Sequence, residues 1–169
     1  MPPQSPYSYI KMYQVHIYTD GASKGNPGPG GYGVVMEVPN SNYKKEFYEG
    51  FRLTTNNRME LLAVIVGLEK LRKPNTKVLV ISDSKYVVDA VNQKWILGWE
   101  KKNFKGVKNP DLWMRFLRVY RKHQVDFKWI KGHNNHPQNE RCDQLAVFAA
   151  SQEKLSVDSF YENQEAGLL

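Results

Sequence analysis

The first fifty residues alternate between apolar and polar side chains. Residues 13–20 carry apolar side chains at every second position, which predicts a strand that ends at Asp20. The stretch 21–31 is rich in glycine and proline and predicts a turn. Further strands are predicted over 33–38 and 43–53. Because the links between them are short, these three strands should form an antiparallel meander.

The rest of the chain alternates between helical and strand patterns. Apolar residues recur at helical spacing over 57–71, and Asn56 or Asn57 can cap that helix. Residues 78–81 are a continuous apolar run, typical of a strand buried on both faces. The remaining predicted elements are short helices over 84–92 and 94–99, a helix over 111–122, a strand over 125–129 and a helix beginning at Pro137. This order predicts an α/β fold with a five-stranded mixed sheet, in which parallel strands join the three-strand antiparallel meander and helices pack on both faces.

The chain has the length and the apolar content of one domain. Its 169 residues are 41% hydrophobic, which is enough for a single buried core. We expect one domain over residues 12–152, preceded by an N-terminal extension, residues 1–11, without the basic start and apolar run of a signal peptide. Residues 153–169 show little periodicity and are predicted to form a flexible acidic tail. No stretch approaches the roughly 20 apolar residues that span a bilayer.

Positive charge is concentrated in the body of the chain. The net charge is +7, but residues 151–169 hold one lysine and four acids, which leaves 23 basic and 13 acidic residues elsewhere, about +10. Such a basic domain favours a polyanionic partner such as nucleic acid, although a basic protein without that partner has the same composition. Cys142 is the only cysteine, which excludes an internal disulfide and a cysteine-based metal cluster and favours a reducing cytoplasm.

Four acidic residues stand where the predicted elements can bring them together. Asp20 and Asp83 end the first and fourth predicted strands, and sites in open α/β sheets gather at such ends. Glu60 lies in the first turn of the helix after the meander, and Asp143 lies in the second turn of the last helix. Four adjacent carboxylates repel each other unless protons or cations neutralise them. Mg²⁺ prefers oxygen ligands, and two such ions about 3.5–4 Å apart can promote hydrolysis of a phosphodiester.

Each of these acids also has an ordinary structural explanation. Asp20 can be a turn residue. Glu60 can complete a capping box, and Asp83 can cap the helix that follows it. Asp143 can be a surface acid beside the apolar stripe of its helix. Spacing alone leaves both interpretations open.

Six short motifs, in order along the chain, resemble the ribonuclease HI family. They are Tyr18-Thr19-Asp20-Gly21, the glycine-rich segment 25–33, the segment 54–61, Ser82-Asp83-Ser84 with Tyr86-Val87, Lys131-Gly132-His133, and Asn139-Glu140-Arg141-Cys142-Asp143. One such motif would be weak evidence, whereas six in family order over roughly residues 12–150 are highly specific. The resemblance implies a ribonuclease H-like fold and an endonuclease that cuts the RNA strand of an RNA–DNA hybrid, leaving 5′-phosphate and 3′-hydroxyl ends.

The resemblance also implies roles for individual residues. Two Mg²⁺ ions, for which Mn²⁺ can substitute, would be bound with the substrate by Asp20, Glu60, Asp83 and Asp143. His133 would assist proton transfer or product departure. The RNA strand near the cut would be contacted by Asn26, Asn56 and Asn57, whose amides can bind 2′-hydroxyl groups. A phosphate of the DNA strand would be held by Thr55 and Asn109.

A lysine-rich loop over residues 101–110 follows two tryptophans, Trp95 and Trp99. The loop contains no acidic residue, and its lysines are Lys101, Lys102, Lys105 and Lys108. Lysines neutralise phosphates without reading sequence, although a lysine run is often only a solvated surface. By resemblance the loop is a basic protrusion that grips the DNA strand, and Trp99 packs on the DNA sugars. Trp95 and Trp113 are expected in the core.

Two departures from the best-known bacterial form of the family affect these expectations. The lysine-rich loop is several residues shorter, which bears on hybrid affinity. Lys85 stands where that form carries glutamine, which bears on substrate contact but not on a metal ligand.

Two other functions remain open from the sequence. A nuclease of the same fold with a different nucleic-acid substrate would share the carboxylates, and a catalytically silent hybrid-binding module would share the basic loop. The complete set of four carboxylates argues against the silent module, and the pair Asn56-Asn57 argues for hybrid specificity. We expect a monomer that acts on a hybrid duplex in the cytoplasm, without a membrane.

Overall fold

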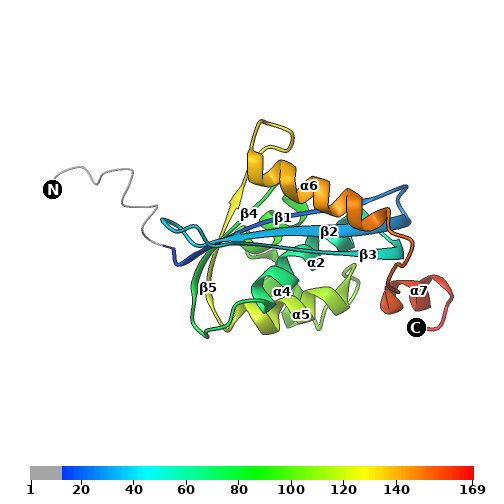
Figure 1. Ribbon diagram of the computed structural model, residues 1–169. Coiled ribbons are helices and arrows are strands. Elements are labelled where there is room, and N and C mark those ends of the chain that lie inside the picture. Colours follow the sequence, from blue (N-terminus) through cyan, green and yellow to red (C-terminus); the bar gives the residue numbers. More distant parts are fainter. Residues whose placement is uncertain (1–12) are drawn as a thin grey trace.

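A five-stranded mixed sheet organises the protein, whose computed structural model describes residues 13–169 (Figure 1). Its antiparallel meander consists of β1 (Val15–Ser23), β2 (Gly28–Glu37) and β3 (Lys44–Thr54). Strand β4 (Lys77–Ser82) pairs in parallel with β1, and β5 (Gln124–Trp129) pairs in parallel with β4, which gives the order β3-β2-β1-β4-β5. The predicted sheet is therefore confirmed. The expected N-terminal extension, residues 1–11, lies outside the described residues.

Helices cover both faces of this sheet, as predicted. The helices of the described residues are α2 (Asn56–Glu69), α3 (Lys85–Asn92), α4 (Trp95–Lys101), α5 (Pro110–Tyr120), α6 (Pro137–Ala150) and α7 (Ser159–Glu165). Helix α6 lies across β1, β2 and β3 on one face, and α2 packs on β1 and β2 from the opposite face (Figure 1). Helix α5 packs on α2, and α7 contacts β3. Between residues 13 and 169, no helix is long and apolar enough to cross a membrane.

Two apolar cores, one on each face of the sheet, follow from the alternation of side chains along the strands. Ile17 packs in the larger core with α2 and α5, whereas its neighbour Tyr18 packs in the smaller core with α6. Strand β4 likewise sends Val80 into the larger core and Ile81 into the smaller one. Because β4 is buried on both faces, its sequence is a continuous apolar run rather than an alternating pattern.

The meander is longer than predicted at its glycine-rich segment. Strand β1 continues to Ser23 and β2 begins at Gly28, so the turn predicted over 21–31 shrinks to residues 24–27. The pairing continues because Ser23 lies opposite Gly30 in an unbroken antiparallel ladder. Asp20 therefore lies within a strand and not at the start of a turn.

The C-terminal tail packs against the domain and contains a helix, where the sequence predicts no element. Ser156 forms a parallel bridge with Phe51 of β3, and α7 follows it. Asp158 caps α7 and is only 8% exposed, since its carboxylate is paired with Arg58 of α2. The pattern failed because these contacts join segments 100 residues apart and leave no local periodicity.

Candidate active site

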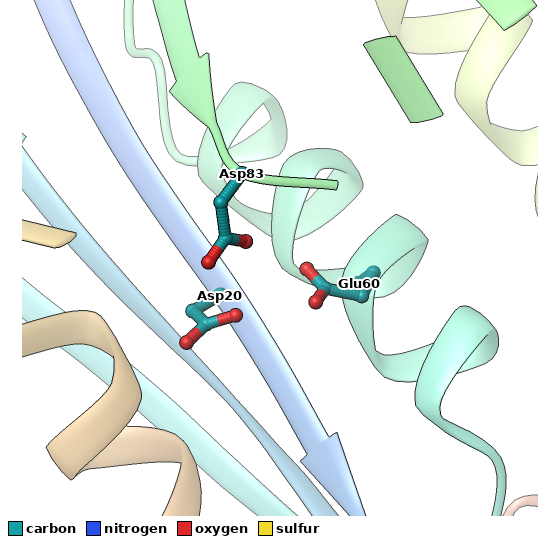
Figure 2. Close-up of side chains that lie close together, drawn as sticks. All are labelled: Asp20, Glu60 and Asp83. Carbon is teal, nitrogen blue, oxygen red and sulfur yellow. The ribbon is translucent and has the colours of Figure 1, made fainter. Parts of the chain in front are cut away.

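The pairing of β1 with β4 brings two of the four acidic residues together. The pairing ends with Thr19 opposite Ser82, so the next residues, Asp20 within β1 and Asp83 just after β4, lie side by side. Glu60 approaches from α2, which packs on β1. In Figure 2 the three carboxylates point toward one another.

These three residues, which we call the carboxylate cluster, form a compact group of oxygens. Each of Asp20, Glu60 and Asp83 offers one oxygen, and the three oxygens lie within 4.8 Å of one another. Asp20 is 6% exposed, and the buried Oε2 of Glu60 has no hydrogen-bond partner. Among residues 13–169 no ion pair connects the cluster to a lysine or arginine. Buried carboxylate oxygens without partners are costly, and a divalent cation with oxygen ligands would offset that cost. The residues present therefore fit such a cation.

Burial and mutual repulsion make these carboxylates hard to ionise. Burial, followed by repulsion from Asp83, raises the pKa of Asp20 to about 8. Burial and the charges of Asp20 and Asp83 raise the pKa of Glu60 well above its ordinary value. Burial also raises the pKa of Asp83, against the opposing effects of a hydrogen bond from Asn139 and the charge of His133. Without cations the cluster therefore retains protons near neutral pH, and a cation would displace them.

Asp143 stands beside the cluster rather than within it. It is not one of the three residues whose oxygens meet. Burial is the largest cause of the raised pKa of Asp20 and of Asp83, and the charge of Asp143 raises both further. The preceding residue, Cys142, lies directly over β2. A Cβ on Gly33 would come within 2.2 Å of the Cys142 carbonyl oxygen, and Gly33 pairs with Asp20. The close approach of α6 to the sheet thus brings Asp143 to the rim of the cluster.

His133 lies on the loop between β5 and α6, next to the cluster. A Cβ on the preceding residue, Gly132, would come within 2.6 Å of Oδ2 of Asp83. His133 is exposed and has a left-handed backbone, with a φ of 54°. The loop histidine singled out in the sequence is thus one residue from a close contact with the cluster and open to solvent.

The explanations of three acids as turn or cap residues are wrong. Asp20 lies inside β1. The residue that caps α2 is Thr55, whose hydroxyl accepts a backbone N–H at 3.2 Å, so Glu60 lies beyond the position of a capping box. The residue that caps α3 is Ser84, whose hydroxyl accepts a backbone N–H at 3.3 Å, and Asp83 is left without that role.

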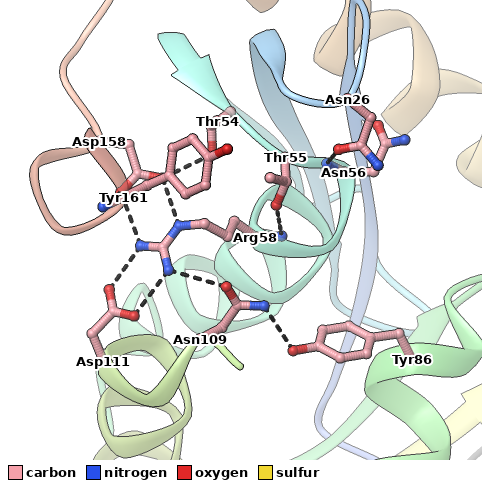
Figure 3. A network of polar contacts seen from close by, with 10 residues as sticks. All are labelled: Asn26, Thr54, Thr55, Asn56, Arg58, Tyr86, Asn109, Asp111, Asp158 and Tyr161. Atoms are coloured by element: carbon pink, nitrogen blue, oxygen red, sulfur yellow. Dashed lines mark hydrogen bonds and ion pairs between the residues drawn. The ribbon is translucent and has the colours of Figure 1, made fainter. Parts of the chain in front are cut away.

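A second group of buried charges surrounds Arg58, two residues before Glu60. Its guanidinium is 2% exposed and donates to both oxygens of Asp111 at 2.9 and 2.7 Å and to both oxygens of Asp158 at 2.7 and 2.9 Å (Figure 3). Asp158 also accepts the Thr54 hydroxyl at 2.8 Å. We call Arg58, Asp111 and Asp158 the arginine network. The sequence hardly indicates this network. Arg58 stands two residues before Glu60, but both carboxylates come from distant segments of the chain.

The asparagines assigned to the RNA strand gather around the start of α2. Oδ1 of Asn26 accepts the backbone N–H of Asn56 at 3.1 Å (Figure 3). Oδ1 of Asn56 accepts the backbone N–H of Ser23 at 2.7 Å. Asn57 is exposed. Neither Asn56 nor Asn57 caps the helix, because Thr55 does. The three asparagines are therefore neighbours, and two of them also hold the β1–β2 turn against α2.

A polar cavity of about 370 Å³ joins this region to the basic loop. It is lined by Asn26, Thr55, Asn57, Lys108 and Asn109, and by Tyr161, Gln164 and Glu165 of α7. The amide of Asn109 donates to the Tyr86 hydroxyl at 2.9 Å and accepts from Arg58 at 3.3 Å. The two residues assigned to a DNA phosphate, Thr55 and Asn109, thus face one cavity.

The four lysines of the basic loop are exposed, and none of them takes part in an ion pair within residues 13–169. Trp99 is half-buried, with its ring 5.4 Å from that of Trp113. Trp113 is fully buried, as expected. The expectation for Trp95 is wrong, since it is 52% exposed as the first residue of α4, where its side chain projects away from the core.

Lys85 stands beside the carboxylate cluster. Its Nζ lies 4.8 Å from the centre of the Trp129 ring, and the indole N–H of Trp129 donates to the backbone oxygen of Asp83 at 3.0 Å. Lys85 and Trp129 thus add a cation and an aromatic surface next to Asp83, a pairing that their separation in the sequence conceals.

Comparison with known proteins identifies the family of this chain. A family model described as RNase H matches residues 12–151. The ribonuclease H of Shewanella sp. (strain ANA-3) is 53% identical over 156 residues, which cover 88% of this chain and 94% of that protein. The chain belongs to the RNase H family. The ribonuclease H of Desulforamulus reducens, another RNase H relative, is 53% identical over 152 residues, with coverage of 87% of this chain and 94% of that protein.

Solved RNase H structures share the fold. LC9-RNase H1, described as a type 1 RNase H with the type 2 active-site motif, superposes with a TM-score of 0.76 at 31% identity, covering 92% of this chain and 82% of its own. LC11-RNase H1 in complex with an RNA/DNA hybrid superposes with a TM-score of 0.60 at 29% identity, covering 80% of this chain and 96% of its own. The RNase H-like fold expected from the resemblance is confirmed.

Proposed function

We propose that this protein is an endonuclease that hydrolyses the RNA strand of RNA–DNA hybrids with divalent metal ions. The observation that carries the proposal is the carboxylate cluster, whose three oxygens meet within 4.8 Å without a lysine or arginine partner in the described chain. Membership of the RNase H family supports the same activity.

Two Mg²⁺ ions are the cofactors that suit this donor set. Asp20, Glu60 and Asp83 would hold them, and Asp143, at the rim, would complete the ligands once substrate brings its phosphate oxygens. Bound Mg²⁺ supplies positive charge that makes a water molecule a stronger nucleophile and stabilises the departing oxygen of a phosphodiester. Mn²⁺, which also accepts carboxylate ligands, would substitute for Mg²⁺.

The protein's own groups would orient the reaction and move protons. Water attacks phosphorus as the bond from phosphorus to the 3′-oxygen breaks, which leaves a 5′-phosphate on one RNA fragment and a 3′-hydroxyl on the other. The 3′-oxygen gains a proton as it departs. His133 is exposed beside Asp83 and is suited to accept or donate that proton, or to assist the departure of product.

Hybrid specificity would come from two sets of contacts, one to each strand of the hybrid. Amides of Asn26, Asn56 and Asn57 would bind 2′-hydroxyl groups of the RNA strand, which DNA lacks. The cavity that contains Thr55 and Asn109 would hold a phosphate of the DNA strand. Trp99 would pack on the DNA sugars. The exposed lysines that would neutralise DNA phosphates are Lys101, Lys102, Lys105 and Lys108. The related LC11-RNase H1, solved with an RNA/DNA hybrid, supports this class of substrate.

The test is a cleavage assay on three matched duplexes: RNA–DNA hybrid, double-stranded RNA and double-stranded DNA. We expect internal cuts in the RNA of the hybrid alone, with Mg²⁺ or Mn²⁺, and none with EDTA. End analysis of the fragments should show 5′-phosphates and 3′-hydroxyls. Cleavage of another duplex at a similar rate would indicate a same-fold nuclease with a different substrate, and tight hybrid binding without cleavage would indicate a silent binding module.

A further inference from the structure

The polar cavity beside the start of α2 has a wall that the proposed function leaves unused. Helix α7 contributes Tyr161, Gln164 and Glu165 to this cavity. These residues are three and four positions apart, so they share one face of the helix. Tyr161 is buried, whereas Gln164 and Glu165 are exposed. The wall therefore has a packed base and a polar rim.

Separate contacts hold α7 in place without using that face. Glu162, which points elsewhere on the helix, forms a two-pronged ion pair with Arg52 of β3 at 2.9 to 3.1 Å. Upstream of the helix, Ser156 accepts the backbone N–H of Arg52 at 2.9 Å and donates to the carbonyl of Gly50 at 2.8 Å. Asp158 anchors the first turn in the arginine network (Figure 3). The helix is thus held in place by contacts that do not use the residues facing the cavity.

Only two of the residues that line the cavity carry a full charge, and the charges are opposite. Lys108 comes from the basic loop and Glu165 comes from α7. The other lining side chains are amides and hydroxyls, which can donate to phosphate oxygens. A phosphate in the cavity would be attracted by Lys108 and repelled by Glu165, since both effects act over a few ångströms.

We propose that α7 is part of the substrate-binding surface and that Glu165 sets how strongly the cavity holds a backbone phosphate of the duplex. This inference rests on the proposed function and deepens it, because it assigns a binding role to the acidic C-terminal segment. The carboxylate of Glu165 offsets part of the attraction that Lys108 exerts. The affinity of the enzyme for its substrate is therefore tuned from the end of the chain.

The test compares E165Q with E153Q, a matched control. Glu153 is exposed and does not line the cavity, so E153Q makes the same change in net charge at another position of the tail. The dissociation constant of an RNA–DNA hybrid is measured with EDTA, so that no cleavage intervenes, and KM is measured with Mg²⁺. E165Q should tighten hybrid binding roughly two- to fivefold at low salt and lower KM, whereas E153Q should change neither by as much. The difference should shrink at high salt, where the charges are screened.

Several outcomes would overturn the inference. Unchanged hybrid binding by E165Q would show that α7 does not face the phosphate. Equal tightening by E165Q and E153Q would reduce the effect to net charge. A loss of thermal stability in E165Q without a change in binding would indicate a purely structural helix. Absence of cleavage by the parental protein, with the binding difference intact, would instead refute the proposed activity and leave the role of α7 standing.

Discussion

Two groups of acidic residues lie close together beside the start of α2. One group is paired with an arginine of the protein, and the other has no basic partner. In the arginine network, Arg58 donates four hydrogen bonds to two carboxylates. In the carboxylate cluster, which includes Glu60 two residues later, three acids face one another with no lysine or arginine among the described residues paired to them. In the first group a buried guanidinium offsets one of the two negative charges and hydrogen-bonds both carboxylates, whereas the second group is neutralised only by protons or cations from solvent. The carboxylates that lack a basic partner therefore form the group at which we expect a cation to bind.

The largest effect should come from removing one charge of the carboxylate cluster. D20N keeps the shape of the side chain and the pairing of β1 but removes a proposed metal ligand, and we expect cleavage to fall at least about a thousandfold. Single-turnover cleavage with Mg²⁺ measures the loss. Hybrid binding and thermal unfolding are the controls, and both should stay close to those of the parental protein. Near-normal turnover in D20N would remove Asp20 from the mechanism.

Breaking the arginine network should instead damage stability. R58M leaves the buried Asp158 and the half-buried Asp111 without their partner and is expected to lower the free energy of unfolding by about 3–5 kcal/mol. Urea denaturation measures this loss. The matched control is R52M, which breaks the exposed pair between Arg52 and Glu162 and should lower the free energy of unfolding far less, because solvent screens that pair. Equally small losses in the two variants would contradict the structural role of the network.

The lysines of the basic loop are also unpaired, but they carry positive charge. Replacing its four lysines by alanine should raise KM for the hybrid about tenfold at moderate salt and flatten the dependence of KM on salt, because fewer phosphates are neutralised. The control replaces exposed lysines outside the loop, namely Lys44, Lys73, Lys122 and Lys154. An equal rise in KM in both variants would show that the loop lysines act only through the net charge of the protein.

A smaller effect should appear in the pH dependence of stability without metal. The pKa of Asp20 is raised by burial and by Asp83 to about 8, above its ordinary value of 3.8, so between these values the native state binds more protons than the unfolded state. In EDTA the protein should therefore gain stability as the pH falls from 8.5 to 5.5, by several degrees in Tm. The slope should be weaker in D20N, and Mg²⁺ should raise the Tm of the parental protein more at the higher pH. Identical pH profiles for D20N and the parental protein would contradict the raised pKa.

Much of the fold is encoded in local patterns, whereas parts of the site are not. The continuous apolar run of β4 and the alternation in β1 were enough to predict both strands and to place Asp83 directly after β4, but not the continuation of β1 past Asp20 to Ser23. The tail had no such pattern, because its contacts reach distant segments: Asp158 pairs with Arg58, 100 residues away, and Glu162 pairs with Arg52. The start of α2 was missed by one residue, since threonine and asparagine are both good caps and only the fold chooses between them. Trp95 was misassigned because an apolar residue at a helix start can face either way.

The position of α6 depends on the absence of a side chain at Gly33 of β2. At Gly33 the main chain of β2 meets the main chain of the helix, so the clearance between them cannot be adjusted by a change of rotamer. A single added methyl group would lift the helix and draw Asp143 away from the other three acids. The geometry of an ion site can thus be governed by a residue that offers no ligand and touches no ion.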